Sequence, residues 1–487
     1  MEFKYSLDNK RYHTLNYELT NRFGSRVFKV SLNGNFSCPN FKNNKGCIFC
    51  SALGSGDFAG RKEDSITNQF NDIKKKLNNK WPDTKYIAYF QANTNTYAPV
   101  STLKKKYEEA LRLPNVVGIN IGTRPDSISE ECLNYLKELN KRTYLTIELG
   151  LQSMHDKTLK LINRGHDLKC FDECVKKLKE NDIRVVVHII NGLPYETKEM
   201  MLGTIKHLNK LKIDGIKIHM LHVLKNTALQ SYYEKNPFHL LTKEEYVNIV
   251  CDQIEELNDN IVIHRLTGDG AKDDLIAPLW TLKKVCVLND IDKELKRRKT
   301  FQGFNKSILN RAKLICEKAI KKGDITVDAT CGNGFDTLFL AKLSKKVFAF
   351  DIQKNAIENT RKLLIKNNCT NVDLINDSHD KIDIYLNNYI KKISLVMFNL
   401  GYLPGGDKSI TTCHLATLSA IKKSLTLLNN KGLILIVCYP HKEGIKESNL
   451  IIKYVKENNI SYKIYKNTDN INAPFLIVID NLNKLLS

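Results

Sequence analysis

The sequence lacks any run of about 18 apolar residues, so it predicts no membrane-spanning helix. Its first residues, Met1-Glu2-Phe3-Lys4, lack the apolar stretch of a secretory signal peptide. We therefore expect a soluble, cytoplasmic protein without a membrane partner. Low-complexity segments and short repeats are also absent. Hydrophobic residues make up 42% and charged residues 26% of the chain, which excludes a mainly disordered or fibrous protein.

Acidic residues are scarce relative to basic ones. The 487 residues include 53 Asp and Glu against 75 Lys and Arg, a formal net charge of +22. Residues 1–304 and 305–487 each contribute +11, so the excess is not confined to a tail. This charge suits a polyanionic partner such as RNA, although solvated lysine faces would give the same value. The length predicts two or three domains.

Disulfides are not expected in a cytoplasmic chain, so the 13 cysteines are thiols or metal ligands. Three of them, Cys38, Cys47 and Cys50, cluster with C-x8-C-x2-C spacing in a polar loop. Three thiolates can bind three irons of a four-iron cluster and leave the fourth iron open. A structural zinc takes four ligands, and only His13 stands upstream as a possible fourth. The spacing favours a [4Fe-4S] cluster, with zinc as the alternative.

Through the first 304 residues, short β-branched runs alternate with amphipathic stretches, which is the pattern of a βα repeat and predicts a parallel sheet or barrel. Polar residues follow the predicted strands, and strand ends meet on one face of a barrel, where active sites lie. We expect strands at 86–90, 116–121, 143–148, 184–190, 215–220 and 261–266, and helices at 103–111, 129–139, 154–161, 170–181 and 243–257.

The cysteine motif resembles that of the radical S-adenosylmethionine (SAM) superfamily, and its long first gap is similar to the branch of Elongator's catalytic subunit. The resemblance covers residues 1–304 and implies a partial (βα) barrel in which the open iron chelates SAM and an electron from the cluster cleaves it. It also implies an external electron donor such as flavodoxin or ferredoxin. The residues it assigns to SAM are Phe49, Gln91, Asn93, Glu148 and Asn191.

Several roles in this half stay open. Glu148 could bind ribose hydroxyls or the amino group of SAM, or form a strand-end salt bridge. Arg124 could clamp a carboxylate or phosphate of the substrate, or pair with Asp126. His219, His222 and His264 are predicted substrate contacts, although a lone histidine is more often structural.

A second βα series begins after residue 305, where we place the domain boundary. Strands are expected at 325–330, 346–350, 372–375, 393–399, 432–439, 462–466 and 475–479, after a helix at 310–322. Between the first strand and the next helix lies a loop with Gly332 and Gly334, which permit close approach of a ligand to the backbone. Thr337 replaces the third glycine of the dinucleotide pattern, and Asp351 ends the second strand, where a carboxylate accepts ribose hydroxyls.

This half resembles class I SAM-dependent methyltransferases with a Rossmann-like fold, and in particular the family described as putative ribosomal-RNA methylases. The resemblance covers residues 306–487 and implies a second SAM site, with an amine as methyl acceptor. His441 departs from the family's usual motif. The implied cofactor residues are Asp328, Gly332, Gly334, Asp336, Thr337, Asp351 and Gln353, and the implied catalytic residues are Asn399, Tyr402, Asp377 and His379.

Together the two resemblances imply a bifunctional enzyme for the wobble uridine of tRNA. The first half would convert 5-carboxymethylaminomethyl-(2-thio)uridine to 5-aminomethyl-(2-thio)uridine, and the second would methylate the new amine. Three alternatives remain: the same two chemistries on ribosomal RNA or another tRNA base, a zinc-binding first domain, and an inactive RNA-binding module.

Overall fold

The computed structural model describes residues 5, 9–44, 46–51, 59–78, 84–268, 270, 272–400, 413–466 and 473–480. The chain divides into two compact units, Met1–Gly303 and Phe304–Ser487. Each unit is described by itself below.

The first unit is built on a seven-stranded parallel sheet with the order β1-β2-β3-β4-β5-β6-β8. The sheet curls into an open barrel, because Lys29 on one edge strand lies 3.0 Å (Nζ to Nδ1) from His264 on the other. The strands are β1 (Val27–Leu32), β2 (Lys85–Phe90), β3 (Val116–Thr123), β4 (Tyr144–Gln152), β5 (Arg184–Asn191), β6 (Gly215–Met220) and β8 (Val262–Arg265). A short pair, β7 (Val223–Leu224) and β9 (Leu275–Ala277), stands apart from it.

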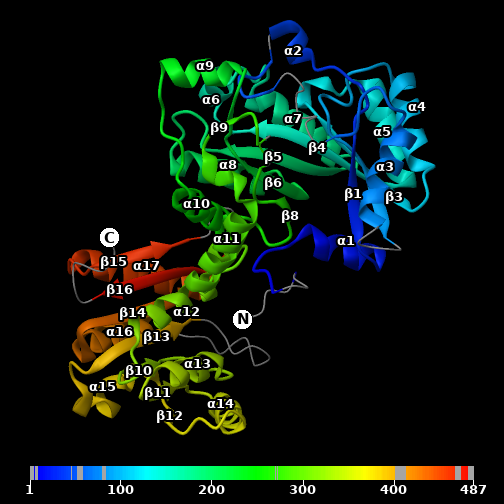
Figure 1. Cartoon of the computed structure of the whole chain (residues 1–487). Coiled ribbons are helices and arrows are strands. Elements are labelled where there is room, and N and C mark those ends of the chain that lie inside the picture. The colour runs from blue at the N-terminus through cyan, green and yellow to red at the C-terminus, as the bar shows by residue number, and fades with distance from the viewer. Residues whose placement is uncertain are drawn as a thin grey trace. The chain divides into compact units, whose positions relative to one another are not determined.

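Helices cover the outside of this sheet (Figure 1). The buried faces of most of them meet the apolar strands in one core that runs from Tyr12 to Leu295, whereas Leu159 and Leu229 belong to a second, smaller cluster. The helices are α1 (Leu15–Phe23), α2 (Pro39–Asn44), α3 (Ile66–Asn78), α4 (Val100–Leu111), α5 (Glu130–Arg142), α6 (Asp156–Leu161), α7 (Leu168–Lys179), α8 (Lys198–Lys210), α9 (Ala228–Lys235), α10 (Lys243–Glu256) and α11 (Lys284–Arg298). The expected partial barrel is confirmed.

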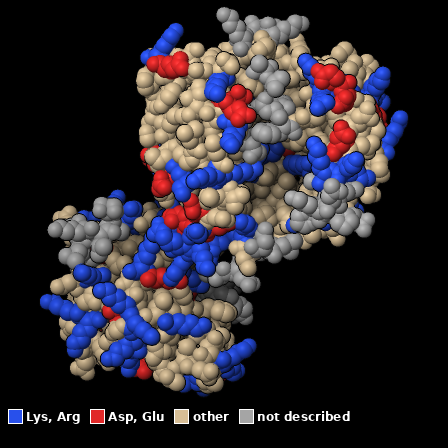
Figure 2. Space-filling view, viewed as in Figure 1, with Lys and Arg blue, Asp and Glu red and all other residues tan. Residues whose placement is uncertain are grey.

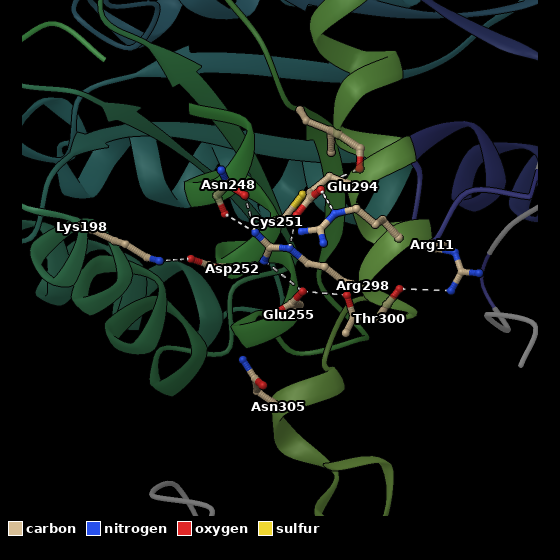
Figure 3. Close-up of polar contacts among 12 residues, drawn as sticks. Arg11, Lys198, Asn248, Cys251, Asp252, Glu255, Glu294, Arg298, Thr300 and Asn305 are labelled. Atoms are coloured by element: carbon tan, nitrogen blue, oxygen red, sulfur yellow. Dashed lines mark hydrogen bonds and ion pairs between the residues drawn. The ribbon is translucent and has the colours of Figure 1, made fainter. Parts of the chain in front are cut away.

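The end of α11 is fastened to α10 by a single arginine (Figure 3). Arg298 donates to Asp252 and Glu255 of α10 and to Glu294 one turn back on α11. Glu255 also accepts the hydroxyl of Thr300 at 2.7 Å. Because each partner satisfies the others, this polar cluster fixes the last helix of the unit against its neighbour.

The second unit contains a seven-stranded sheet with the order β12-β11-β10-β13-β14-β16-β15. All pairs are parallel except those made by β16, which runs antiparallel to both neighbours. This is the Rossmann-like arrangement expected for a methyltransferase. The strands are β10 (Ile325–Asp328), β11 (Lys346–Phe350), β12 (Val372–Ile375), β13 (Ile393–Asn399), β14 (Leu428–Cys438), β15 (Tyr462–Tyr465) and β16 (Phe475–Asp480).

Helices pack on both faces of this second sheet, because alternate residues of its strands are apolar on both sides. Leu395 and Met397 of β13 join the core beneath α12 and α13, whereas Val396 and Phe398 join the core beneath α16 and α17. The helices are α12 (Ile308–Ala319), α13 (Phe335–Leu343), α14 (Lys354–Lys366), α15 (Ile382–Tyr385), α16 (His414–Leu427) and α17 (Lys442–Glu457).

Lys and Arg side chains are spread over the face of the second unit seen in Figure 2, with few acidic groups among them. None of the helices in the described residues has the length and apolar character needed to cross a membrane.

Candidate active sites

The three clustered cysteines face one cavity of about 570 Å³ inside the first unit. Cys38, Cys47 and Cys50 lie on the loop that follows β1, at the carboxyl ends of the strands. Cys47 accepts N–H groups from Asn40 (3.4 Å) and from Arg164 (3.6 Å). These are donors that stabilise thiolates and iron–sulfur clusters, so the residues present fit such a cluster.

The electrostatics favour the thiolate form of one of these cysteines. A hydrogen bond from Cys50, followed by the charge of Arg164, lowers the pKa of Cys47 to about 5 against the opposing effect of burial. The same hydrogen bond and burial raise the pKa of Cys50 well above its usual value.

His13 is not a fourth ligand of this cluster. Its ring stacks on Tyr5 at 4.4 Å, and its Nε2 lies 3.4 Å from a carboxylate oxygen of Glu18. Its backbone N–H donates to Gln302. Tyr5 precedes α1, Glu18 lies in α1 and Gln302 lies near the end of the unit, so the packing of the N-terminal segment accounts for this histidine.

A buried carboxylate, Glu148 of β4, lies at the centre of the barrel interior and is 1% exposed. One of its oxygens accepts from Lys29 of β1 (3.0 Å) and Asn120 of β3 (2.8 Å). The other accepts from His188 of β5 (2.9 Å) and Lys217 of β6 (2.5 Å). Of the roles considered for Glu148, the structure shows the salt bridge. Both carboxylate oxygens already accept hydrogen bonds from these four residues.

The charges of this network shift its pKa values in opposite directions. Although burial alone would raise it, the pKa of Glu148 is held well below its usual value by Lys217 and Lys29. Burial lowers the pKa of Lys217 to about 8 and that of His188 to about 4. At neutral pH Glu148 is therefore a carboxylate, Lys217 an ammonium group and His188 a neutral imidazole.

The predicted residues of the first unit divide into two groups. Six of them line the cavity: Phe49, Gln91, Asn93, Arg124, Glu148 and His219. The other three, Asn191, His222 and His264, are not among the lining residues. Asn191 exchanges amide hydrogen bonds with Gln253 at 2.8 and 2.9 Å, and the Nδ1 of the half-buried His264 lies 3.0 Å from Lys29, so contacts within the unit account for both.

Arg124 is committed to a neighbour within its own segment. Two of its nitrogens donate to the two carboxylate oxygens of Asp126, at 2.9 and 2.6 Å, and a third donates to the backbone of Arg164 at 2.8 Å. The pairing with Asp126 is thus the alternative that the structure contains.

Four members of the Glu148 network are not among the sequence-predicted site residues: Lys29, Asn120, His188 and Lys217. Each is a polar residue within an apolar strand, and such a residue points into the barrel because side chains alternate along a strand. Lys217 in the strand Gly215–Met220 carries the clearest signal, since a buried lysine needs a partner.

In the second unit, the glycine loop between β10 and α13 holds its predicted shape. Gly332 and Gly334 have φ values of +51° and +82°, which favour glycine, and a Cβ on Gly334 would stand 2.8 Å from Thr360. Asp351 accepts the backbone N–H groups of Gly332 (3.0 Å) and Gln353 (2.9 Å). The loop thus brings the carboxylate and the glycine backbone together at one edge of the sheet, as a SAM site requires.

Asp328, the last residue of β10, holds this loop by accepting two hydrogen bonds, one from the loop and one from the first turn of α13. It accepts the hydroxyl of Thr337 at 2.6 Å and the N–H of Thr330 at 3.2 Å, and it is 1% exposed. Burial, with the nearby charge of Asp336, raises the pKa of Asp328 to about 7. Asn399, at the end of β13, donates its backbone N–H to Thr330 and its amide to Asp336 at 3.1 Å.

The remaining predicted catalytic residues differ in their surroundings. Asp377 pairs with Lys381 at 2.9 Å, which together with other hydrogen bonds lowers its pKa to about 2. His379 is buried, lies 3.1 Å (Nδ1) from the carbonyl of Ala329, and has no partner at Nε2 among the described residues. Burial lowers its pKa, so its imidazole is neutral at pH 7. Tyr402 lies outside the described residues.

A histidine–carboxylate pair that the sequence analysis did not single out lies at the same edge of the sheet. His414, the first residue of α16, pairs through Nδ1 with Glu443 in the first turn of α17. These helices follow the adjacent parallel strands β13 and β14. His441 instead caps α17 by accepting the N–H of Gly444 at 3.1 Å. His414 and Glu443 are 29 residues apart in the sequence, so no local motif predicts that they pair.

Comparisons with known proteins agree with this division. Residues 42–208 match the family model of the radical SAM superfamily, residues 213–297 the radical SAM C-terminal domain, and residues 347–480 the family described as "Putative rRNA methylase". The fold and both sites therefore define an enzyme with a radical SAM domain and a methyltransferase domain.

Three relatives match different parts of this chain. The uncharacterized protein YtqA of Bacillus subtilis is 52% identical over 304 residues, which are 62% of this chain and 94% of YtqA. The chloroplastic tRNA (mnm(5)s(2)U34)-methyltransferase of Arabidopsis thaliana is 42% identical over 151 residues, 28% of this chain and 54% of that protein. The tRNA uridine(34) acetyltransferase of Methanocaldococcus infernus is 28% identical over 154 residues, 30% of this chain and 28% of that protein.

The chain belongs to the family of YtqA, within the radical SAM superfamily, and carries a methyltransferase domain of the second family as well. Membership implies a [4Fe-4S] cluster with SAM in the first unit and a second SAM site in the other.

Proposed function

We propose that this protein modifies the wobble uridine of tRNA in two consecutive steps. The radical SAM unit converts 5-carboxymethylaminomethyl-(2-thio)uridine to 5-aminomethyl-(2-thio)uridine. The methyltransferase unit then converts the product to 5-methylaminomethyl-(2-thio)uridine. The observation that carries the proposal is that one chain joins the two chemistries while its relatives include both a methyltransferase and an acetyltransferase named for uridine 34 of tRNA.

In the first unit, Cys38, Cys47 and Cys50 would hold the cluster, and Asn40 and Arg164 would stabilise the sulfur of Cys47. The cluster and SAM supply the one-electron chemistry that starts the reaction, with flavodoxin or ferredoxin as the external donor. Phe49, Gln91 and Asn93 line the same cavity and would hold SAM beside the substrate.

In the second unit, Asp351 and the backbone at Gly332 would hold the ribose side of SAM. Asp328, Asp336, Thr337 and Gln353 support that loop or lie at its rim. Most of the acceleration would come from aligning the acceptor amine with the sulfonium methyl group, and Asn399 would orient that amine without adding charge.

The amine must lose a proton before it can accept a methyl group. Asp377 is a poor acceptor, because its ion pair with Lys381 lowers its pKa to about 2. His379 is the better candidate, because its imidazole is neutral and its Nε2 has no partner among the described residues. His414, paired with Glu443, stands at the same edge of the sheet as a second candidate.

A purified, anaerobically reconstituted enzyme tests the proposal on tRNA that carries the carboxymethylaminomethyl group. We expect aminomethyluridine with SAM and reductant, followed by methylaminomethyluridine. Cys47→Ser should leave the starting nucleoside, whereas Asp351→Asn should accumulate aminomethyluridine. Unchanged tRNA in the presence of an intact cluster would overturn the proposal.

The family description "Putative rRNA methylase" favours ribosomal RNA as a second candidate substrate. Incubating the same enzyme with ribosomal RNA and tritium-labelled SAM distinguishes the two. Label in ribosomal RNA, with none in tRNA, would replace the wobble position as the substrate.

A further inference from the structure

Four basic residues line the cavity of the first unit: Arg124, Arg164, Lys217 and Arg265. Glu148 is the only carboxylate among the described residues that line it, and Arg164 donates to the sulfur of Cys47. Arg124 is matched by Asp126 outside the lining. The inner end, where Lys217 meets Glu148, is the part that the cofactor roles above leave unassigned.

Within the described part of the chain, the network at this inner end does not balance its own charge. Two ammonium groups, those of Lys29 and Lys217, contact the single carboxylate Glu148. The neighbouring Tyr89 stays a neutral phenol because burial raises its pKa well above its usual value, and the pKa of His188 is lowered to about 4. A surplus charge away from water is costly unless an anion neutralises it.

Lys217 is the lysine of this pair that faces the cavity. Its ammonium group has three N–H donors, of which one goes to Glu148 (2.5 Å) and one to the hydroxyl of Tyr89 (3.0 Å). Among the described residues, no acceptor lies within hydrogen-bond distance of the third donor, which can therefore serve a ligand. Lys217 therefore has a fixed position, a positive charge and a spare hydrogen bond at the wall of the cavity.

His219 adds a second polar group on the same side. It lies two residues along β6 from Lys217, so both side chains point to the same face of the strand, and both line the cavity. Its Nε2 is buried and has no hydrogen-bond partner among the described residues. A buried nitrogen without a partner beside a surplus ammonium group indicates a missing polar ligand.

We propose that Lys217 and His219, with Arg265 on the neighbouring strand β8, form a carboxylate-binding subsite that takes the carboxymethyl carboxylate of the substrate. This inference rests on the proposed function and extends it by naming the residues that recognise the group to be removed. A carboxylate there places the rest of its molecule in the same cavity as the three cysteines. The subsite would therefore select carboxymethylaminomethyluridine over its aminomethyl product.

The first experiment compares equilibrium binding of two tRNAs to the full, cluster-loaded chain. One tRNA carries the carboxymethylaminomethyl group and the other carries the aminomethyl group. A charge-assisted hydrogen bond predicts that the wild type prefers the carboxylated tRNA by roughly ten- to hundredfold. Lys217→Met should abolish this preference and leave the affinity for the aminomethyl tRNA within about twofold.

Lys179→Met is the matched control, because Lys179 pairs with Asp214 (2.6 Å) and is not among the residues that line the cavity. It should keep the full preference. Folding of Lys217→Met is checked by its iron content and melting temperature. We expect both to be retained, since the substitution leaves one lysine for one carboxylate.

A second experiment tests whether the subsite binds the carboxylate of the substrate or that of SAM, since SAM also carries a carboxylate. Calorimetry measures SAM binding to both sites in the wild type and in Lys217→Met. Unchanged SAM affinities, with lost tRNA preference, support the substrate carboxylate. A tenfold or greater loss of SAM affinity at one site, with the tRNA preference kept, would overturn the assignment in favour of the methionine carboxylate.

The remaining outcomes separate this inference from the function on which it rests. If the wild type processes the tRNA but Lys217→Met still prefers the carboxylated form, the subsite is wrong and the proposed function stands. If the wild type neither prefers nor alters the carboxylated tRNA, the proposed function fails and the subsite assignment fails with it.

Discussion

At the scale of single residues, the proposed carboxylate subsite depends on the ionisation of Lys217. Burial lowers its pKa to about 8, with Glu148 acting in the opposite direction and Lys29 and Arg265 in the same one. The ammonium form is therefore present at neutral pH and is lost as the pH rises through about 8.

This gives a pH-dependent prediction for tRNA discrimination. The preference for carboxymethylaminomethyl over aminomethyl tRNA should fall as the pH rises through about 8, because Lys217 loses its charge. Lys217→Arg should keep the preference across the range, since a guanidinium group does not deprotonate. Binding measured from about pH 6.5 to 9.5 tests this. A preference in the wild type that does not change with pH would contradict it.

Asp328 gives a stability prediction for the second unit. Burial raises its pKa to about 7, above the unfolded value, so the folded state binds the extra proton between about pH 4 and 7. Its contribution to stability is therefore present at low pH and lost as the pH rises through about 7. Asp328→Asn should raise the free energy of unfolding at pH 8 by about 2 kcal/mol and leave it unchanged near pH 4.

Calorimetry of the full chain measures the melting transition of the second unit at both pH values. Asp373→Asn is the control, because Asp373 is 52% exposed and pairs only with Lys346 at the surface, and it should shift stability by less than about 0.5 kcal/mol. A destabilised Asp328→Asn protein at pH 8 would show that the charged form is required for folding.

Individual site residues were predictable where the motif is local and not where the partner is distant. Cys38, Cys47 and Cys50 share one loop, and their spacing alone brought them together. Asn191 also follows the pattern of a cofactor-binding residue at a strand end. Its side chain instead bonds to Gln253, 62 residues away in the sequence, and it is not among the residues that line the cavity.

At the scale of elements, the strands that alternate with clear helices were predicted well. The bounds of β6, β11, β12 and β13 agree with the expectation, because each is a short apolar run between strong helix signals. Strand β1 was missed. Its Lys29 and Ser31 interrupt the apolar pattern, and only pairing with β2 and the contact of Lys29 with Glu148 make it a strand of the barrel.

The helix pair α10 and α11 should depend on Arg298. It is 18% exposed and joins Asp252, Glu255 and Glu294, so its removal leaves three carboxylates without their shared cation (Figure 3). Arg298→Ala should lower the free energy of unfolding of the first unit by about 3 kcal/mol. Arg297→Ala should change it by less than about 0.5 kcal/mol, because Arg297 is 73% exposed.

Chemical denaturation of the full chain, followed through the first unit's transition, compares the two variants. Equal effects of Arg297→Ala and Arg298→Ala would mean that the polar cluster contributes no more than a surface ion pair.

At the scale of the whole molecule, the positive charge shared by both halves predicts a salt-dependent affinity for the proposed tRNA substrate. Phosphate contacts release counterions, so the affinity should fall by roughly 100- to 1,000-fold between about 50 and 200 mM salt. The slope should be the same for both tRNAs above, because phosphate contacts do not depend on the wobble group. Filter binding at several salt concentrations measures the slope. An affinity that does not vary with salt would argue against a polyanionic substrate.

Joining two SAM-dependent units in one chain has a kinetic consequence under the proposed function. The amine released by the first unit stays near the second, at a high effective concentration. The order of the steps follows from their chemistry, because the methyl acceptor is the product of the first reaction.

The most direct test is mass spectrometry of wobble nucleosides from a bacterium that lacks both steps, with and without this gene. We predict that carboxymethylaminomethyluridine is replaced by methylaminomethyluridine. The replacement should stop at aminomethyluridine with Asp351→Asn and should not begin with Cys47→Ser. An unchanged nucleoside profile, in cells where the protein carries its cluster, would contradict the account.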